Sequence, residues 1–549
     1  MAARITLPPV AAATVVGAAA WAYQLQQPMT DTVMIALALA VPFYVFVWLS
    51  WLYPLYFSPL RHVPTVPGFP LWGQFFTIIT EECGVPQRRW HKEHGSIIRY
   101  FFPFGSERLS IADDEALKQM TLKNPYNYPK PVRAKLWMVR ILGEGVLLAE
   151  GWEHIRQRKA LAAGFSTQAI RALMPIFWEK SMLMAQLWRD EMAAAKVTTK
   201  SFEVLDWLNR CTLDIIGKAG FGYEFNSLKD PEVPIRQAYR LVFDFGLMSR
   251  LLHGLQAFIP ASKLIPAKMN RDMETARKII LSKANRIICE KLADAQNNVN
   301  KKDILALIAR ENKEVKAAGE RGLSSTTMRD QIMTFLGAGH DTTATGVAWT
   351  IHLLSTHPEI QLRLRDEIRE HIPFLFTGDH QDQVSSSLVD PQRLAAALDP
   401  DKLPYLDNVC RESLRYIPPI PMTVRQSIKD DVLGGYRVPG GTVIYVLANT
   451  INRLPAFWGD TADEFDPDRW DALPAGVVPN AFMTFLHGPR GCIGRKFAET
   501  EMKILLCCLL AVFEFARDYD TPDPEEWKMW RLVLRPKDGV TVRVRLAGR

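Results

Sequence analysis

Several features that would point directly to a function are missing from this sequence of 549 residues. It has no Cys-x-x-Cys pair, and its seven cysteines are spaced for neither a disulfide framework nor a zinc site. Lys and Arg number 66 against 59 Asp and Glu, but no block of five or six basic residues occurs, which argues against nucleic-acid binding. Internal repeats and a glycine-rich dinucleotide fingerprint are also absent. A redox enzyme with this sequence would therefore receive its electrons from another protein.

Charge is nearly absent from the first 60 residues. No charged residue occurs in residues 5–30 or 32–60, and Asp31 alone separates the two stretches. A bilayer core needs about 20 apolar residues of helix, so residues 33–57 predict a transmembrane helix. Residues 7–25 predict either a second span or, with Arg4 before them and small residues near their end, a cleaved signal peptide. The sequence thus predicts a membrane anchor over residues 1–60.

Proline and glycine are concentrated just after the second uncharged stretch. Residues 61–73 contain Pro64, Pro67, Gly68, Pro70 and Gly73, and prolines at this spacing cannot continue a helix. They predict a stiff, extended connector between the membrane and the rest of the chain, although an ordinary loop would have a similar composition.

Beyond the connector, apolar residues recur mostly with a helical period. Helices are predicted over residues 168–193, 202–216, 272–295, 326–355, 358–371, 402–416 and 495–513. Strands are few, at residues 97–102, 442–447 and 541–546, and residues 376–401 have the polar composition of a surface insertion. The pattern predicts a mainly α fold with small β-sheets, of the α+β class.

One cysteine is distinguished by its surroundings. Cys492 lies in the stretch from Phe485 to Gly494, just before a predicted helix, where free N–H groups and the helix dipole favour a thiolate that can ligate iron. Gly488 and Gly494 allow the backbone to approach a flat cofactor closely. Arg490 is placed to pair with an anion beside the metal. The alternative is a buried structural cysteine in a glycine-rich turn.

These residues carry a family resemblance. Phe485, Gly488, Arg490, Cys492 and Gly494 match every fixed position of the pattern F-x-x-G-x-R-x-C-x-G. The chain therefore resembles the cytochrome P450 superfamily, and most of all its membrane-bound microsomal members of fungal natural-product oxidation. The resemblance implies a cytochrome P450 fold over residues 74–549, preceded by the transmembrane anchor. It also implies that haem b (iron protoporphyrin IX) is bound through the Cys492 thiolate.

A second match is the stretch Ala-Gly-His-Asp-Thr-Thr at residues 338–343, inside a predicted long helix. Glycine and threonine are poor helix formers, so a kink with a packing role is one interpretation. The resemblance implies that Gly339 leaves room over the cofactor and that Asp341 and Thr342 hold and relay protons.

A third match is the pair Glu412 and Arg415, which lie three residues apart and hence on one helix face. The spacing alone is also that of ordinary exposed ion pairs. The resemblance implies that these residues and Arg469 form a buried structural network, which locks the loop before the thiolate.

The remaining matches concern the carboxylates of the cofactor. An indole N–H and a guanidinium are suitable donors to a carboxylate. The resemblance implies that Trp152 and Arg156, four residues apart on an earlier helix, bind a haem propionate, and that Arg425 binds a propionate too. The alternatives are a packed aromatic residue and a surface charge.

The resemblance implies a haem-thiolate monooxygenase, which inserts one oxygen atom from O2 into a lipophilic small molecule by hydroxylation or epoxidation, in secondary-metabolite biosynthesis. Two alternatives stay open. One is a family member that isomerises or dehydrates its substrate without a reductase, and the other is a non-catalytic haem-binding membrane protein. The presence of both Asp341 and Thr342 favours the monooxygenase.

The implied electron donor is an NADPH-dependent flavoprotein reductase, and the implied location is the endoplasmic reticulum membrane with the catalytic domain facing the cytosol. A basic docking surface is predicted from Arg156, Arg158, Lys159, Arg495, Lys496 and Lys503, unless these residues form a solvated helix face. The resemblance places the substrate pocket at residues 126–148, 247–266, 335–338, 420–423 and 530–533. No nucleic acid is expected as a partner.

Overall fold

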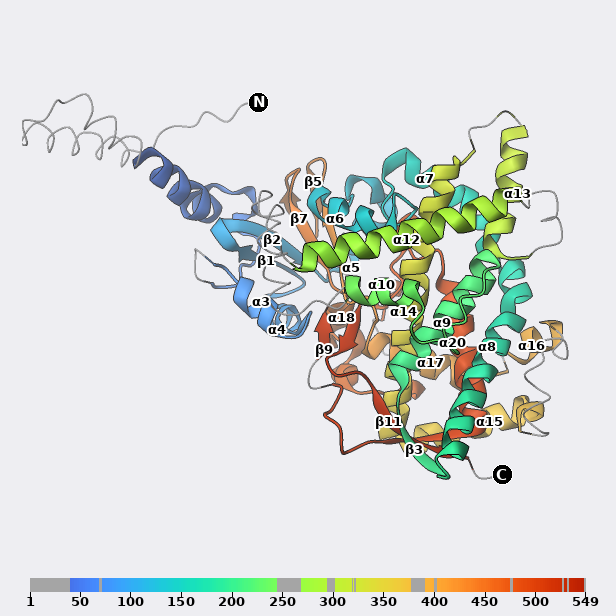
Figure 1. Ribbon diagram of the computed structural model, residues 1–549. Helices are drawn as coiled ribbons and strands as arrows, with labels where there is room; N and C mark the ends of the chain where they lie inside the picture. Colours follow the sequence, from blue (N-terminus) through green and yellow to red (C-terminus); the bar gives the residue numbers. More distant parts are fainter. Residues whose placement is uncertain are drawn as a thin grey trace, which may run out of the picture.

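The computed structural model of the protein is shown in Figure 1. It describes residues 40–68, 72–243, 268–293, 302–317, 319, 322–376, 391–398, 402–473, 477–525, 528–530 and 533–547. The expected second span at residues 7–25, the predicted pocket stretch 247–266 and most of the predicted insertion 376–401 lie outside these residues.

Helices form most of the described structure, as predicted. The α-helices are α3 (Phe75–Thr80), α4 (Val85–His94), α5 (Asp114–Lys118), α6 (Val132–Leu142), α7 (Gly151–Leu161), α8 (Thr167–Ala194), α9 (Val204–Ile215), α10 (Pro234–Phe243), α12 (Lys268–Ala293), α13 (Ile304–Ala317), α14 (Ser325–Thr356), α15 (Pro358–His371), α16 (Pro391–Ala397), α17 (Pro404–Tyr416), α18 (Ala448–Ile451), α19 (Pro455–Trp458) and α20 (Arg495–Val512).

The predicted helices are confirmed, with shifted ends. The helix expected over residues 202–216 begins only at Val204, because Phe202 and Glu203 pair with a strand. The carboxylate of Glu203 accepts hydrogen bonds from the N–H groups of Leu205 and Asp206, which caps the helix and stops it from extending backwards.

The strands of the described residues form four small sheets. The largest has the order β1 (Ile97–Phe102), β2 (Ser106–Ile111), β7 (Val443–Val446) and β4 (Thr423–Gln426), with β2 and β7 parallel. A second sheet has the order β3 (Thr199–Glu203), β11 (Thr541–Leu546) and β8 (Phe513–Arg517). The pairs β5 (Asp431–Leu433) with β6 (Tyr436–Val438), and β9 (Lys528–Trp530) with β10 (Leu534–Pro536), are antiparallel. The strands predicted at 97–102, 442–447 and 541–546 are confirmed as β1, β7 and β11.

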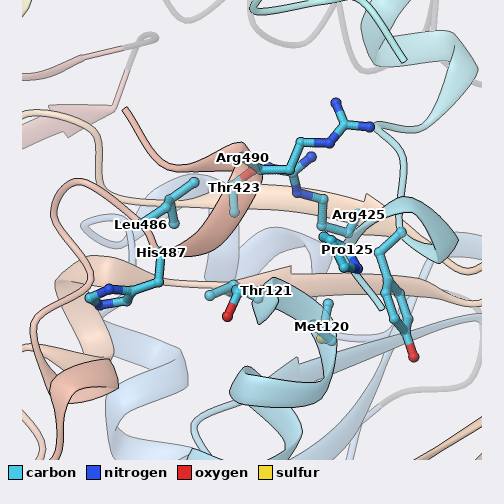
Figure 2. Close-up of a pocket in the computed structure, with 10 residues that line it drawn as sticks. Met120, Thr121, Pro125, Thr423, Arg425, Leu486, His487 and Arg490 are labelled. Atoms are coloured by element: carbon cyan, nitrogen blue, oxygen red, sulfur yellow. The ribbon is translucent and has the colours of Figure 1, made fainter. Parts of the chain in front are cut away.

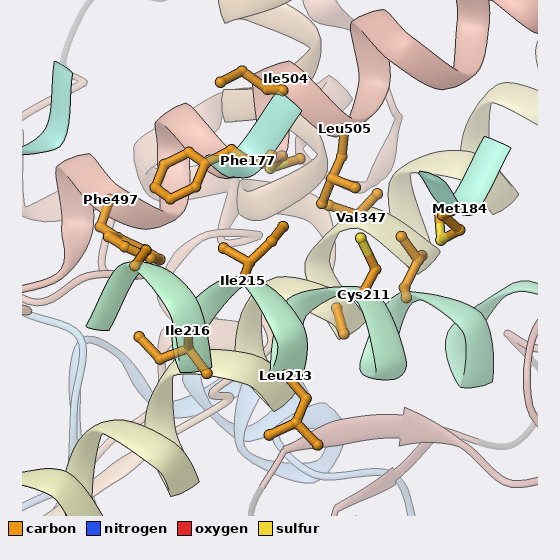
Figure 3. Packing of buried hydrophobic residues seen from close by; sticks show 14 of the residues in the cluster. Phe177, Met184, Cys211, Leu213, Ile215, Ile216, Val347, Phe497, Ile504 and Leu505 are labelled. Atoms are coloured by element: carbon orange, nitrogen blue, oxygen red, sulfur yellow. The ribbon is translucent and has the colours of Figure 1, made fainter. Parts of the chain in front are cut away.

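The main hydrophobic core lies where α8, α9, α14 and α20 pack together (Figure 3). Phe177 of α8 meets Phe497 of α20 edge to face, with the ring centroids 4.7 Å apart. The hydroxyl of Thr212 in α9 donates to the carbonyl of His340 in α14 over 2.9 Å. The 32-residue α14 is therefore held from several sides, and it carries the stretch 338–343 at its buried centre.

All seven cysteines are free. Cys211, Cys410, Cys507 and Cys508 are buried, as expected of small hydrophobic residues, but Cys289 is exposed on α12. Disulfides therefore do not contribute to the stability of this structure, which rests on the packed core.

The described end of the predicted span forms a helix, Ala40–Phe57, that is long and apolar enough to cross a membrane. It extends away from the β1–β2 sheet at one edge of the molecule (Figure 1). The described part of the expected connector is hydrogen-bonded to the folded domain. The N–H of Val66 donates to the carbonyl of Arg99, and the N–H of Arg99 donates to that of Pro64, so this part lies along β1.

Candidate functional site

The loop before α20 has a conformation that few sequences allow. Leu486 and Gly488 both have positive φ values, of 56° and 69°. A Cβ atom on Gly488 would lie only 2.0 Å from the carbonyl oxygen of Thr121, so any side chain there would force the two backbones apart. The N–H of Cys492 donates to the carbonyl of Phe485 over 2.8 Å and closes the loop on itself.

Cys492 lies at the start of α20 and is exposed to solvent, although many protein atoms lie near its sulfur. Burial raises the pKa of the Cys492 thiol, whereas the N–H of Gly494 and the positive charge of Arg158 act to lower it. A Cβ atom on Gly494 would make only ordinary contacts, at 3.8 Å from Phe165 and 4.0 Å from the sulfur. The space beside the sulfur therefore stays open on the Gly494 side.

Glu412 and Arg415 form a fully buried ion pair on α17, with both side chains at 0% exposure. Arg415 Nη2 lies 2.7 Å from one carboxylate oxygen, and Nε lies 2.8 Å from the other. Arg469 joins the same carboxylate at 3.4 Å, and the indole N–H of Trp470 donates to it over 3.0 Å. The structure thus brings the three predicted network residues together and adds Trp470.

This network reaches the cysteine loop through Asn452. Arg415 donates to the carbonyls of Asn452 and Ala462, at 2.8 and 2.7 Å. The side chain of Asn452 in turn accepts from the N–H of Met483 and donates to the hydroxyl of Thr484, just before Phe485. Sequence reasoning missed Asn452 because nothing in its own neighbourhood shows that a guanidinium holds its backbone.

A cluster of cations lies on the other side of the cysteine loop. Arg425 and Arg490 line one pocket (Figure 2), and Arg490 forms an ion pair with Glu150. Burial, followed by the charge of Arg490, lowers the pKa of Arg425 to about 10. Burial and the charge of Arg425 lower that of Lys130 to about 7. Arg425 Nη1 and Arg490 Nε are buried without a hydrogen-bond partner.

Trp152 and Arg156, the predicted propionate ligands on α7, lie elsewhere than the sequence led us to expect. Trp152 is 73% exposed, and Arg156 is paired with Glu153 and donates to the carbonyl of Gly322 over 2.7 Å. The structure therefore does not bring Trp152 and Arg156 to the cation cluster. Their side chains leave α7 on the side that faces solvent and the start of α14, away from the cysteine loop.

His154 and Arg158, two positions further along α7, do reach the cluster. His154 is buried and hydrogen-bonded to the hydroxyl of Tyr126 over 3.0 Å, and the ring of Tyr126 lies under the guanidinium of Arg490. Burial and the charge of Arg490 lower the pKa of His154 to about 3, so it is neutral. Arg158 donates to the carbonyl of Gly491, beside the cysteine, over 2.7 Å. The same four-residue spacing, read two positions later, would have found both.

On α14, the acid of the 338–343 stretch is paired with a residue from a distant strand. Asp341 is completely buried and forms an ion pair with Arg535 of β10. The indole of Trp349 on α14 donates to the carbonyl of Leu534 over 2.9 Å and holds β10 in place. The Thr342 hydroxyl donates to the carbonyl of Ala338 over 2.7 Å, which leaves its oxygen able to accept a further hydrogen bond.

Gly339 lies in close contact with the side chain of Ile216. A Cβ atom there would lie 3.2 Å from the side chain of Ile216 in η7 (Ile216–Gly220), a tight contact. The missing side chain therefore lets α14 pack closely against η7, and the expectation that Gly339 also leaves room over a cofactor stays a prediction.

The sequence was also compared with known proteins. Residues 63–543 match the family model described as Cytochrome P450. Cytochrome P450 monooxygenase sphH of Aspergillus fumigatus is 33% identical over 90% of this chain and 89% of its own. Cytochrome P450 monooxygenase ALT8 of Alternaria alternata is 33% identical over 91% of this chain and 92% of its own. Cytochrome P450 monooxygenase FUM15 of Gibberella moniliformis is 34% identical over 87% of both chains.

The buried network generates a stability prediction. Arg415→Ala removes two hydrogen bonds from the carboxylate of Glu412 and the guanidinium donors of three backbone carbonyls, and we expect it to cost about 3–5 kcal/mol of the free energy of unfolding. Arg411→Ala, four residues away on α17, removes a half-exposed partner of Asp407 and should cost about 1 kcal/mol or less. Urea titration of both full-length variants in detergent, followed by circular dichroism, measures the difference. Equal midpoints would contradict the structural role of Arg415.

Proposed function

The chain belongs to the cytochrome P450 family and is a monooxygenase of that family, and on this premise we propose that it hydroxylates or epoxidises a lipophilic small molecule in fungal secondary metabolism. The observation that carries the proposal is the cysteine loop, with an accessible thiol on one side and a surplus of buried cations on the other. The family implies a haem-thiolate cofactor, and we propose haem b with Cys492 as its ligand.

The residues present are suitable for such a group. Lys130, Arg425 and Arg490 lie near one carboxylate, Glu150, which leaves an excess of two positive charges when Lys130 is protonated. Haem b carries two propionates, and the buried, unpartnered Nη1 of Arg425 and Nε of Arg490 are free donors for carboxylate oxygens. Arg158 adds a further cation between this cluster and the cysteine.

When bound, the haem supplies the activation of dioxygen, and a thiolate ligand favours cleavage of the O–O bond. The protein's part is to hold and tune that ligand. Cys492 presents its sulfur at the N-terminus of α20, where the N–H of Gly494 donates to it. The buried network of Glu412, Arg415 and Arg469 keeps the loop in one conformation, so the sulfur has a defined position.

We propose that Asp341 and Thr342, on α14, hold and relay protons. Asp341 is fully buried, but its partner Arg535 retains 16% of its side-chain exposure, which gives the acid a link towards solvent. The Thr342 hydroxyl donates to the carbonyl of Ala338, and we propose that its oxygen accepts a hydrogen bond during proton transfer. We propose that Gly339, which packs against Ile216, also leaves room over the cofactor.

The proposed partners are O2, a lipophilic substrate and an NADPH-dependent flavoprotein reductase. Of the six predicted docking residues, Arg156, Arg158 and Lys503 are engaged with Glu153, Gly491 and Asp407. Arg495 is likewise paired with Glu499, and Lys496 donates to Thr167, so contacts within the chain do not separate the six residues, and the proposed basic docking surface keeps all of them. We place the enzyme in the endoplasmic reticulum membrane, with residues 1–60 as the anchor, 61–73 as the connector and 74–549 as a cytosolic catalytic domain.

The ligand assignment can be checked by spectroscopy. Cys492→Ala should abolish the absorption band that a thiolate-ligated haem shows after reduction and binding of carbon monoxide. Cys410→Ala, which removes a buried cysteine of α17, should keep the band, provided that the variant folds. Retention of the band in Cys492→Ala would refute the assignment.

Substitutions on the two faces of α7 should have different effects on haem retention. Arg158→Ala should lower the ratio of haem to protein after purification several-fold, because it removes a cation beside the cysteine loop. Arg156→Ala should leave that ratio close to the wild-type value, because its partners are Glu153 and Gly322. The opposite ranking would restore the sequence-based expectation for Trp152 and Arg156.

The reaction itself is tested with a panel of lipophilic substrates, a reconstituted reductase and NADPH. We expect mass spectrometry to find products heavier by one oxygen atom, dependent on NADPH. Asp341→Asn should slow product formation roughly 100-fold, because it removes the ionisable acid. Asp366→Asn, which changes an exposed partner of Arg369, is the matched control. Turnover without a reductase would instead favour an isomerase or dehydratase.

A further inference from the structure

The chain turns a corner close to the cysteine loop. Helix α7 continues into η6 (Ala162–Phe165), and the segment Gly151–Phe165 is bent by 56° against α8. The hydroxyl of Ser166 accepts from the N–H of Ala169 over 3.2 Å and caps α8. Phe165 is therefore the last residue of the turn, placed between the end of one helix and the cap of the next.

Contacts with two other helices fix the position of this corner. A Cβ atom on Gly164 would lie 2.8 Å from the side chain of Ile304, so the turn packs directly on the first residue of α13. The ammonium group of Lys496, in the first turn of α20, donates to the hydroxyl of Thr167 over 2.6 Å. The corner is thus fastened to the helix that begins just after Cys492.

These contacts bring the ring of Phe165 close to the sulfur of Cys492. A Cβ atom on Gly494 would lie 3.8 Å from Cε1 of Phe165 and 4.0 Å from Sγ of Cys492. Both atoms therefore border the same small space beside Gly494. The sulfur forms one side of this space, and the aromatic ring forms another.

The ring of Phe165 is also held from α14. The rings of Phe165 and Phe335 meet edge to face, with centroids 5.3 Å apart. Phe335 is buried and lies one helical turn before Gly339. Phe165 thus connects the loop that carries the proposed ligand with the helix that carries Asp341, and it has packing partners that restrict its orientation.

An apolar wall beside a thiolate has a definite electronic effect. Water that donates a hydrogen bond to the sulfur withdraws electron density from it and weakens its bond to iron. Solvent near the site also stabilises the reduced state, which carries one more negative charge. The N–H of Gly494 already donates to the sulfur. A ring that excludes further donors keeps the thiolate electron-rich and lowers the reduction potential of the iron.

We propose that Phe165 is a positioning residue that keeps water from the sulfur of Cys492 on the Gly494 side, and so sets the strength of the iron–sulfur bond and the reduction potential of the haem. The proposal rests on the proposed ligation of haem by Cys492. The alternative is a packing role at the corner between α7 and α8, which would affect stability but not the hydrogen bonds of the sulfur.

Resonance Raman spectroscopy of the full-length ferric protein in H2O and in D2O tests the proposal. In Phe165→Ala we expect the iron–sulfur stretching frequency to fall and to shift more in D2O than in the wild type, because water then donates to the sulfur. Phe165→Leu restores an apolar side chain and should resemble the wild type. Phe374→Ala, which removes a ring that packs on Trp178 in the same core, is the matched control and should also resemble it.

The reduction potential, measured by spectroelectrochemical titration at equal haem content, is the second readout. We expect a more positive potential in Phe165→Ala than in the wild type and in Phe374→Ala. If Phe165→Ala does not retain haem, Phe165→His decides, because it keeps a ring but brings an N–H donor and should shift the potential in the same direction.

The outcomes separate this proposal from the one on which it rests. Lower stability of the Phe165 variants with an unchanged iron–sulfur frequency, D2O shift and potential would overturn the positioning role and leave only packing. Absence of an iron–sulfur band from the wild type would instead refute the ligation by Cys492.

Discussion

The carboxylate of Glu412 is the interaction on which the arrangement of this protein depends most. It lies at the centre of the fold without exposure to solvent, and it is stable there only because Arg415, Arg469 and Trp470 all donate to it. Arg415 then uses its remaining donors to hold the backbone carbonyls of Asn452 and Ala462. One buried charge thus fixes segments that are far apart in the sequence.

The network reaches the cysteine loop through hydrogen bonds of both side chains and backbone. Asn452 is hydrogen-bonded in turn to Met483 and Thr484. The loop that follows is closed by the hydrogen bond from the N–H of Cys492 to the carbonyl of Phe485. Gly488 lets this loop approach Thr121 closely. A metal ligand needs a defined position, and in this protein the position is set by a chain of hydrogen bonds that begins at a carboxylate on another helix.

Charge is arranged differently on the two sides of the loop. The network around Glu412 has two guanidinium groups and one carboxylate, but backbone carbonyls and the hydroxyl of Thr461 accept the other hydrogen bonds of both arginines. The cluster around Arg425 and Arg490 carries more cations than its one carboxylate, Glu150, can pair, and some of its donors have no partner. Buried charges whose hydrogen bonds are all made within the protein need no further group. A surplus of buried cations is costly until an anionic group joins it, and this is the physical reason for treating the cluster as a binding site.

The long helices and three of the strands could be predicted from the sequence, because apolar periodicity over many residues depends only on local geometry. The start of α9 could not be predicted, because Phe202 and Glu203 pair with β11, which lies more than 300 residues away in the chain. The cysteine loop could be found from its motif, and so could the pair of Glu412 and Arg415. The partner of Asp341 could not, because Arg535 comes from a hairpin whose docking on α14 no local pattern encodes.

The sequence by itself determined the family, the cysteine before α20 and the apolar N-terminal stretch, because each depends on residue types at short, fixed spacings. Only the tertiary structure decided which face of α7 meets the cysteine loop. Trp152 with Arg156 and His154 with Arg158 have the same four-residue spacing, and on an isolated helix the two pairs are equivalent. The packing of α7 against Tyr126 and Gly491 turns His154 and Arg158 inwards and leaves Trp152 exposed.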